Sequence, residues 1–298
     1  MVPKGILDTI GNTPMIKIGE IYAKLEAANP SGSIKDRMAW HMVKKAEKQG
    51  KLKKGMHIIE ATSGNTGISF AMISAARGYK FTAVMPESMS MERTRMMKAF
   101  GADVILTPAE EDMAGAVKRC LEIAKKLKNV WLPSQFENPD NPESFRLGLG
   151  KEILAQMPNI DAFVAGVGTG GTLIGAAQAL KKKRPSVRII AVEPRESALL
   201  SGGKPGLHEI EGIGEGFIPE IVSKNIGLID EVIRVSSREA IIERDRLAKE
   251  EGIFVGTSSG ANVLAAKKVA KRLRNVVTVL PDRGERYLSV MQQKVFKQ

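Results

Sequence analysis

The chain has 298 residues, 43% of them hydrophobic, and its 45 Lys and Arg against 33 Asp and Glu give a formal net charge of +12. This length and composition exclude a disordered, collagenous or disulfide-stapled chain and suffice for one large or two medium domains. A single cysteine, Cys120, cannot form an internal disulfide, which fits a reducing cytoplasm. We expect no signal peptide at the first residues, and the five glycines in the uncharged run 162–180 favour a loop and buried helix over a membrane span.

Short apolar runs alternate with longer helical patterns along the chain. Strands are expected at 57–61, 81–85, 103–106, 161–165, 187–192 and 276–280, and helices at 36–49, 65–77, 91–100, 113–127, 142–156, 173–183, 238–251 and 261–274. This alternation predicts an α/β protein with parallel sheets and crossover helices. The polar, proline-rich stretch 133–142 is the best candidate for a linker between two α/β units, and 197–219 is expected to be a long loop.

Basic clusters at 125–128, 181–184 and 267–274 each stand at the C-terminal end of an expected helix, where cations complement the helix dipole. No aromatic residues alternate with them, and no nucleic-acid-binding signature is present. We therefore expect solvated faces and no nucleic-acid partner, with an acidic partner or polyanion as the alternative.

Lys35 follows a Pro/Ser/Gly turn at the start of the expected helix 36–49. A helix N-terminus disfavours an ammonium group and desolvation adds to this effect, so Lys35 is a candidate for a nucleophilic amine with a lowered pKa. The alternative is an ordinary solvated lysine.

Three glycine-rich turns each stand between an expected strand and an expected helix, where backbone N–H groups favour an anion. The first, 62–67, is unusually polar and suits a carboxylate, although Asn65 or Ser63 could be only a helix cap. The second, 166–171, matches G-x-G-x-x-G, and Glu193 follows Gly171 by 22 residues, as in a dinucleotide-binding fingerprint. Its alternative is a tight packing turn.

The third turn, 256–261, contains Ser258, for which an N-cap is the default interpretation. The histidines His41, His57 and His208 lack metal-ligand spacing, so we predict no metal site. No nucleophile elbow with a following acid and histidine is present, so a serine hydrolase is not expected.

Five blocks in order resemble the cysteine synthase family, which belongs to the fold-type II pyridoxal-phosphate enzymes and also contains cystathionine β-synthases. The blocks are Pro-Ser-Gly-Ser-Ile-Lys-Asp-Arg at 30–37, Thr-Ser-Gly-Asn-Thr-Gly at 62–67, Gly-Thr-Gly-Gly-Thr at 168–172, Gly-Thr-Ser-Ser-Gly at 256–260 and Pro-Asp-Arg-Gly-Glu-Arg-Tyr-Leu-Ser at 281–289. The similarity extends from Ile10 to Ser289, which is nearly the whole chain.

The resemblance implies two three-layer αβα units with mostly parallel twisted sheets and pyridoxal 5'-phosphate in the cleft between them. It implies a smaller mobile domain at 36–141 that closes over the substrate and a larger cofactor-binding domain formed by 1–35 and 142–298. It also implies a homodimer, and the tail of a serine acetyltransferase as a partner by family analogy.

The resemblance also implies roles for individual residues. Lys35 would be the Schiff-base lysine and the base that removes the substrate α-proton. Cofactor binding is implied for Lys35, Asn65, Gly168, Thr169, Gly170, Gly171, Thr172 and Ser258. Binding of the substrate carboxylate is implied for Thr62, Ser63, Gly64, Asn65, Thr66 and Gln135.

The reaction implied is β-replacement of O-acetyl-L-serine with sulfide to give L-cysteine, through the Lys35 aldimine and an aminoacrylate intermediate. O-Phosphoserine sulfhydrylase, cystathionine β-synthase and cysteine desulfhydrase activities are alternatives on the same scaffold. From other classes, an NAD-dependent oxidoreductase and a non-catalytic partner-binding protein remain open.

One segment departs from the family pattern. Where the family usually has His and then Thr-Thr-Gly-Pro-Glu, this chain has Phe145-Arg-Leu-Gly-Leu-Gly-Lys-Glu152. We expect this change to affect the choice of substrate more than cofactor binding. For a phosphorylated substrate, Arg195 and Arg283 are the candidate phosphate ligands.

Overall fold

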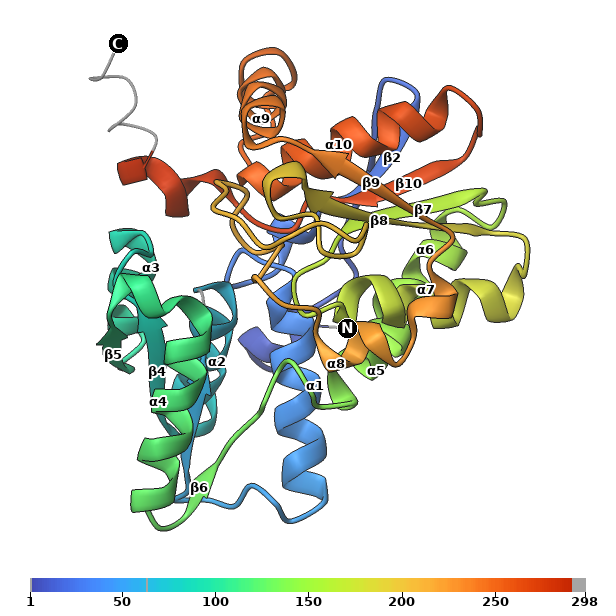
Figure 1. Cartoon of the computed structure of the whole chain (residues 1–298). Coiled ribbons are helices and arrows are strands. Elements are labelled where there is room, and N and C mark those ends of the chain that lie inside the picture. Colours follow the sequence, from blue (N-terminus) through green and yellow to red (C-terminus); the bar gives the residue numbers. More distant parts are fainter. Residues whose placement is uncertain (1, 63, 291–298) are drawn as a thin grey trace.

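Two separate β-sheets form the framework of the molecule (Figure 1), which is described by a computed structural model over residues 2–62 and 64–290. Among these residues the smaller sheet has four parallel strands in the order β5-β4-β3-β6, and the larger has six in the order β1-β2-β10-β7-β8-β9. In the larger sheet β1 pairs antiparallel with β2, and the remaining pairs are parallel.

The strands are β1 (Met15–Ile18), β2 (Ile21–Lys24), β3 (His57–Ala61), β4 (Lys80–Pro86), β5 (Asp103–Thr107), β6 (Val130–Trp131), β7 (Ala162–Gly166), β8 (Arg188–Pro194), β9 (Glu231–Val235) and β10 (Val276–Val279). The α-helices are α1 (Lys35–Lys48), α2 (Asn65–Arg77), α3 (Met91–Ala99), α4 (Asp112–Lys126), α5 (Asp140–Leu147), α6 (Leu149–Gln156), α7 (Gly171–Lys183), α8 (Glu220–Ser223), α9 (Ser237–Glu251) and α10 (Thr257–Ala270). Short 3-10 helices are η1 (Ile6–Thr9), η2 (Glu26–Ala28), η3 (Ala109–Glu111), η4 (Arg195–Ser197), η5 (Ile226–Leu228) and η6 (Gly284–Tyr287).

Helices cover both faces of each sheet, because successive side chains of a strand point to opposite faces and both sets are apolar. In the smaller sheet Ile58 packs in the cluster that contains the α2 side chains, whereas Ile59 packs with those of α4. In the larger sheet Phe163 packs with α6 and α7, and Val164 packs with α9 and α10. Two three-layer αβα units result, and the expected fold class is confirmed.

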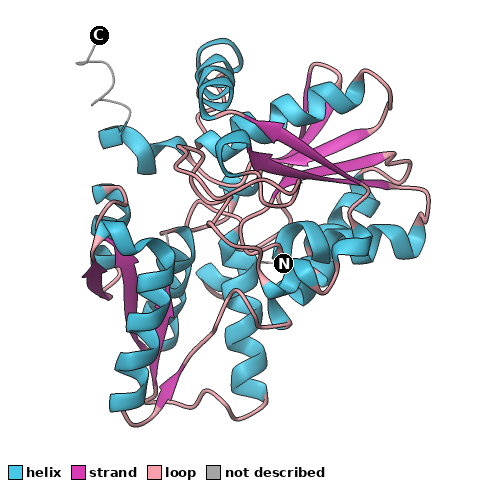
Figure 2. Cartoon of the chain, viewed as in Figure 1, coloured by secondary structure: helices cyan, strands magenta, loops and turns pink. Residues whose placement is uncertain are grey.

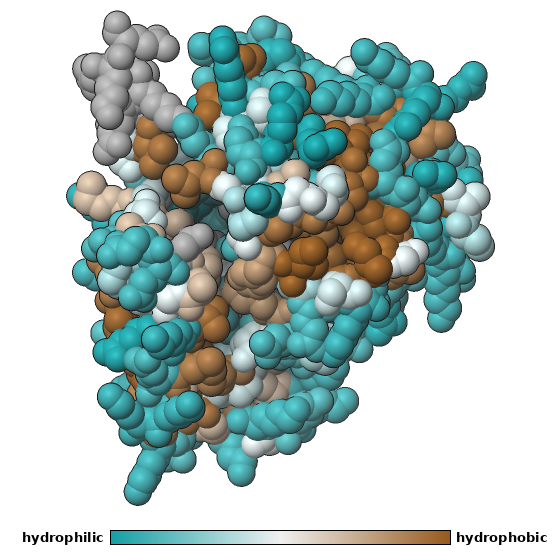
Figure 3. Space-filling view, in the orientation of Figure 1, coloured by the Kyte–Doolittle hydropathy of each residue, from teal (hydrophilic) through white to brown (hydrophobic). Residues whose placement is uncertain are grey.

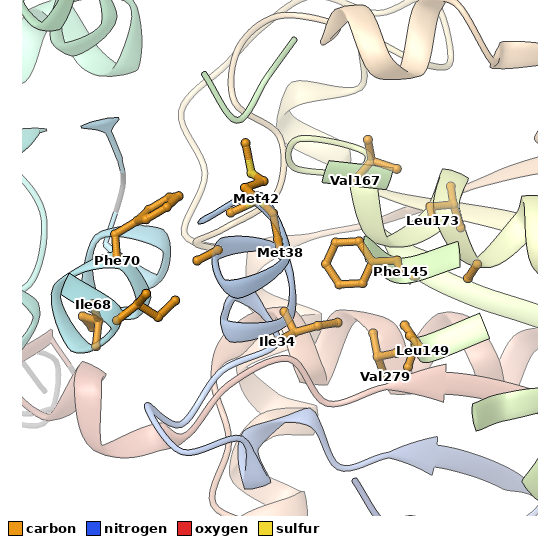
Figure 4. Close-up of a cluster of buried hydrophobic side chains, with 14 of the residues drawn as sticks. Ile34, Met38, Met42, Ile68, Phe70, Phe145, Leu149, Val167, Leu173 and Val279 are labelled. Carbon is orange, nitrogen blue, oxygen red and sulfur yellow. The ribbon is translucent and has the colours of Figure 1, made fainter. Parts of the chain in front are cut away.

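Helix α1 contributes the middle of the main core cluster (Figure 4). Met38 and Met42 of α1 lie between Phe70 of α2 on one side and Phe145 of α5 on the other. All four side chains are fully buried, with 0 to 1% of their surface exposed. The two units therefore share one apolar cluster through α1.

All six strands and all eight helical regions expected from the sequence are present, with ends that differ by a few residues. Four strands were missed: β1, β2, β6 and β9. Strands β1 and β2 have four residues each and are joined by a tight turn in which Gly19 has φ +55°, and β6 has only two residues. Such short segments show too few side chains for an alternating pattern.

The single helix expected at 142–156 is wrong, because α5 ends and α6 begins on either side of Gly148. The backbone there has φ −103° and ψ −91°, outside the helical range. A Cβ at this position would lie 3.0 Å from the Ser144 carbonyl oxygen and 3.3 Å from Nη1 of Arg37. The break therefore lets the Arg37 guanidinium approach the backbone closely.

Helix α10 begins four residues before the expected start at 261 and ends four residues before the expected end at 274. The expected basic residues do stand in the last turns of α4, α7 and α10. No helix within the described ranges 2–62 and 64–290 is both long enough and apolar enough to cross a membrane.

The departing segment is part of the core, since Phe145 and Leu149 are 1% and 0% exposed. We predict that Phe145→Ala lowers the free energy of unfolding by about 3–5 kcal/mol, because it leaves a cavity between α1 and α5. Leu147→Ala is the matched control on the same helix, since Leu147 is 39% exposed, and it should cost about 0.5 kcal/mol. Urea denaturation measures both values, and equal losses would contradict the assignment of Phe145 to the core.

Candidate active site

Loops gather between the two sheets (Figure 2), and there the N-termini of four helices meet around one pocket. The pocket is lined by Lys35 at the start of α1, Asn65 at the start of α2, the 168–172 turn before α7 and Ser258 in the first turn of α10. The partial positive charges of helix N-termini favour an anion. Segments far apart in the sequence thus form one pocket, whose helix N-termini suit an anion.

Lys35 is partly buried in the wall of this pocket. Burial lowers the pKa of its amine, because the charged form loses hydration, and the carboxylates of Glu215 and Asp282 act in the opposite direction. The direction agrees with the lowered pKa expected from the sequence, and the solvated-lysine alternative is wrong.

The glycine-rich turn before α7 has no room for side chains at three positions. A Cβ on Gly168 would meet the Gly212 carbonyl oxygen, one on Gly170 would meet Val222, and one on Gly171 would meet Oδ1 of Asn141. Gly170 also has φ +83°, which glycine adopts readily. The backbone of this turn is therefore exposed to the pocket, where Gly168, Thr169, Gly170 and Thr172 line the wall.

The polar turn at 62–67 folds back on itself. The Thr62 hydroxyl accepts hydrogen bonds from the backbone N–H groups of Gly64 at 3.0 Å and Gly67 at 3.1 Å. Gly64 is the N-cap of α2, and the hydroxyl that accepts from the first-turn N–H of Gly67 belongs to Thr62, so the capping interpretation of Asn65 is wrong. Ser63 lies outside the described residues. Asn65 lines the pocket, whereas Thr62, Gly64 and Thr66 do not.

Gln135 connects this turn to the smaller sheet. Its side-chain amide donates to the Ala61 carbonyl oxygen at 2.9 Å, and its Oε1 accepts from the Thr66 hydroxyl at 2.7 Å. Gln135 is 3% exposed and does not line the pocket itself. Its position beside Thr66 agrees with the grouping of these residues expected from the sequence.

The sequence did not point to Glu60, whose carboxyl contacts the backbone of Gln135. The Glu60 carboxyl accepts hydrogen bonds from the backbone N–H groups of Ser134 at 2.8 Å and Gln135 at 3.4 Å. It is 3% exposed, and this burial raises its pKa from 4.5 to about 8, against the effect of the two hydrogen bonds. The chain gives no local signal of this role, because Glu60 and Gln135 are 75 residues apart.

Ser258 is 3% exposed and lines the pocket. The N-cap of α10 is Gly256, and no side chain caps this helix, so the N-cap interpretation of Ser258 is wrong. Asn262, one turn later, accepts from the Gly166 backbone N–H at 2.8 Å and donates to the Val279 carbonyl oxygen at 3.0 Å. Asn262 therefore joins α10 to the strand ends that border the pocket.

Three charged residues at the pocket were not assigned a role from the sequence. Glu211 lines the pocket and pairs with Arg93 of α3. Asp282 and Arg286 both hydrogen-bond to the side chain of Asn65. The block 281–289 gave a signal for the last two, since it belongs to the resemblance, but no role followed from it.

The dinucleotide interpretation of the second turn fails at Glu193. Its carboxylate accepts from the backbone N–H groups of Leu200 at 2.8 Å and Ser201 at 3.1 Å, and from the Ser201 hydroxyl. Since Glu193 is 3% exposed, this carboxylate supports the loop after β8 and does not face the pocket.

The two arginines considered for a phosphorylated substrate also do not line the pocket. Arg283 donates to the Ala27 carbonyl oxygen at 2.9 Å, and Arg195 forms an exposed ion pair with Glu239 at 3.1 Å. Among the described residues, no group of three or more His, Cys, Asp or Glu side chains is arranged to hold a metal ion.

Comparison with known proteins shows similarity over nearly the full length of the chain. The family model described as "Pyridoxal-phosphate dependent enzyme" matches residues 6–282. A cysteine synthase from Staphylococcus aureus is 49% identical and is covered over 95% of both chains. Among solved structures, an O-acetylserine dependent cystathionine β-synthase from Helicobacter pylori is 42% identical with a TM-score of 0.93, covering 97% of this chain and 98% of the other. A cysteine synthase from Entamoeba histolytica is 40% identical with a TM-score of 0.92, covering 99% and 91%.

The raised pKa of Glu60 predicts a pH dependence of stability. Between pH 4.5 and about 8 the folded chain keeps a proton on Glu60 that the unfolded chain releases, so stability falls as pH rises, by up to about 1.4 kcal/mol per pH unit. Glu60→Gln should remove this decline, which urea denaturation at several pH values measures. Glu20→Gln, at an exposed position, controls for the change in net charge. A decline that persists in Glu60→Gln would contradict the assignment.

Proposed function

Since the chain belongs to the family of pyridoxal-phosphate dependent enzymes, we propose that it catalyses the synthesis of L-cysteine from O-acetyl-L-serine and sulfide. One observation carries this proposal: the Lys35 amine, with a lowered pKa, lines the same pocket as the glycine-rich N-terminus of α7. An amine that reacts with an aldehyde and a backbone cradle for a phosphate are the two features that pyridoxal phosphate requires.

The residues present fit this cofactor. At Gly168, Gly170 and Gly171 a Cβ would collide with Gly212, Val222 and Asn141, so only glycine lets this turn pack so closely against these residues. The backbone of Gly168 and Gly170 lines the pocket, where N–H groups at a helix N-terminus suit a phosphate. Thr169 and Thr172 add hydroxyl groups at the pocket wall. Neutral donors and a helix dipole suit a phosphate ester at a buried site.

When bound, pyridoxal phosphate supplies an electron-withdrawing ring that acidifies the α-proton of the attached amino acid. Lys35 Nζ would accept this proton as the base. Ser258 would be a neutral partner for the ring nitrogen, and Asn65 would donate to the ring hydroxyl. The 62–66 turn, including Ser63, would bind the substrate carboxylate together with Gln135.

We also propose that residues 36–141 form a mobile unit that closes over the substrate. Its polar contacts with the rest of the chain support this: Arg93 of α3 pairs with Glu211 and lies 4.8 Å from the ring centroid of Tyr287. Such polar contacts exchange easily, whereas α1, which shares the apolar cluster with α5 and α6, would be the least mobile part of this unit. Closure would exclude water from the reacting centre.

Further proposals concern partners and location. A homodimer is supported by the resemblance and by an apolar area on the face shown in Figure 3. Leu207, Phe217, Ile218 and Ile226 are among the exposed large apolar side chains. The family resemblance also supports the tail of a serine acetyltransferase as a partner. The free, buried Cys120 fits a cytoplasmic protein.

A second candidate function uses the same pocket with a larger thiol. The Helicobacter pylori structure, 42% identical over 97% of this chain, is titled an O-acetylserine dependent cystathionine β-synthase. In that reaction homocysteine replaces sulfide as the acceptor. The choice of thiol therefore separates the two candidates.

The test is a visible absorption spectrum of the protein loaded with pyridoxal phosphate. We expect a long-wavelength absorption band from the bound cofactor, and this band should change on addition of O-acetylserine. On addition of sulfide the original band should return, and the cysteine formed should equal the O-acetylserine consumed. Return with homocysteine but not with sulfide would favour the second candidate. A protein that gives no band after incubation with pyridoxal phosphate would overturn both.

Lys35→Ala should abolish the covalent attachment of the cofactor, because the amine that forms the bond is gone. Reduction with borohydride followed by mass spectrometry measures this attachment. Lys48→Ala is the matched control, since Lys48 is exposed at the other end of the same helix, and it should retain attachment. Attachment in Lys35→Ala would place the bond on another lysine.

Gly168→Ala tests the phosphate cradle. The added Cβ would meet the backbone carbonyl oxygen of Gly212, so the turn must shift and lose N–H contacts with the phosphate. We expect binding of pyridoxal phosphate to weaken by about tenfold or more in a spectroscopic titration. Gly227→Ala is the control, because no atom lies within 4 Å of a Cβ there. Equal affinities would show that the turn does not hold the phosphate.

A further inference from the structure

The side-chain amide of Asn65 lies between two buried groups of opposite charge. Arg286 Nη1 donates to Asn65 Oδ1 at 2.5 Å, and Asn65 Nδ2 donates to Asp282 Oδ2 at 2.6 Å. A guanidinium has no acceptor and a carboxylate has no donor. If the amide were turned over, its NH₂ group would face the guanidinium and its oxygen would face the carboxylate. A single orientation of Asn65 therefore satisfies both neighbours.

Both charged residues are themselves fixed. Arg286 and Asp282 are 2% and 1% exposed. Arg286 Nη2 also donates to the Ser31 carbonyl oxygen at 2.8 Å, and the Tyr287 hydroxyl donates to Asp282 Oδ2. The other oxygen, Asp282 Oδ1, lies against Gly256, where a Cβ would collide with it. The carboxylate has no freedom to rotate away from Asn65.

The arrangement lowers the stability of the fold, which a purely structural role would not require. Within the part of the chain that the structure describes, Asp282 Oδ1 is buried and has no hydrogen-bond partner. A buried acceptor without a partner destabilises the fold, so this oxygen calls for an explanation. Asn65 lines the pocket, and one of the two Nδ2 hydrogens is used by Asp282.

We propose that Asp282, together with Arg286, is a positioning residue that fixes the Asn65 amide so that the second Nδ2 hydrogen donates to an acceptor oxygen in the pocket. This inference rests on the proposed function, in which that acceptor is the ring hydroxyl of pyridoxal phosphate. Asp282 acts through Asn65 and makes no contact with the cofactor in this scheme. Its effect on the cofactor should depend on an intact Asn65.

The test is a double-mutant cycle on the affinity for pyridoxal phosphate, measured by absorption titration of the apo form. Asp282→Asn keeps the shape but removes the charge, so Asn65 Nδ2 loses its carboxylate acceptor and is held less firmly, while Arg286 still holds Asn65 Oδ1. We expect about tenfold weaker binding and an altered absorption maximum. In an Asn65→Ala background the same substitution should change the affinity much less, because only the effect of the Asp282 charge on Lys35 remains.

If Asp282→Asn does not fold, a second variant tests the same inference. Tyr287→Phe removes only the hydroxyl that holds the same carboxylate, and it should weaken cofactor binding in the presence of Asn65 but not in the Asn65→Ala background. Equal weakening in both backgrounds, or unchanged affinity with Asn65 present, would overturn the inference. Failure of the wild-type protein to bind pyridoxal phosphate would instead overturn the proposed function.

Discussion

A buried ion-pair network around Arg37, in the first turn of α1, holds the site together. Arg37 Nε lies 2.6 Å from Glu26 Oε2, and Arg37 Nη1 lies 2.6 Å from Glu152 Oε1. Lys24 Nζ lies 2.8 Å from Glu152 Oε2. These bonds keep the pKa of Glu152 at about 2, although burial alone would raise it. Removal of one partner from such a network typically costs about 3–5 kcal/mol. Lys35, two residues earlier on the same turn, is therefore held in a fixed position.

Three consecutive residues in the first turn of α1 each contact a different part of the molecule. Lys35 lines the pocket, Arg37 faces η2 and α6, and Asp36 accepts from the Ser31 backbone N–H at 2.7 Å and from the Ser69 hydroxyl of α2 at 2.5 Å. Consecutive side chains of a helix point about 100° apart, so one turn can join both units and still present an amine. The resemblance at 30–37 concerns this turn as a whole, and each of its charged residues has a distinct contact.

Local pattern was sufficient for elements that are long and regular, such as α2, whose bounds 65–77 agree with those expected. It failed at Gly148, where the helix breaks beside the Arg37 guanidinium, a neighbour more than 100 residues away in the chain that no local pattern shows. The pocket was anticipated at Lys35, Asn65 and 168–172 since each stands at a helix start with a distinctive sequence. Glu60 and Asp282 were not, because a carboxylate carries no sign of its partner until the chain brings Gln135 or Asn65 beside it.

The distribution of charge explains how a strongly basic chain can present a selective pocket. Many of its lysines stand in the last turns of α4, α7 and α10, where they complement the helix C-termini. The pocket instead is lined by helix N-termini, the partly buried Lys35 amine and the Glu211 carboxylate, and Asp282 reaches it only through Asn65. Surface charges are screened by salt within about 10 Å, whereas groups in a buried site act at full strength on what they touch. The proposed binding of an anion in the cleft would therefore depend on the backbone geometry of the helix starts, and the excess of surface lysines would contribute little to it.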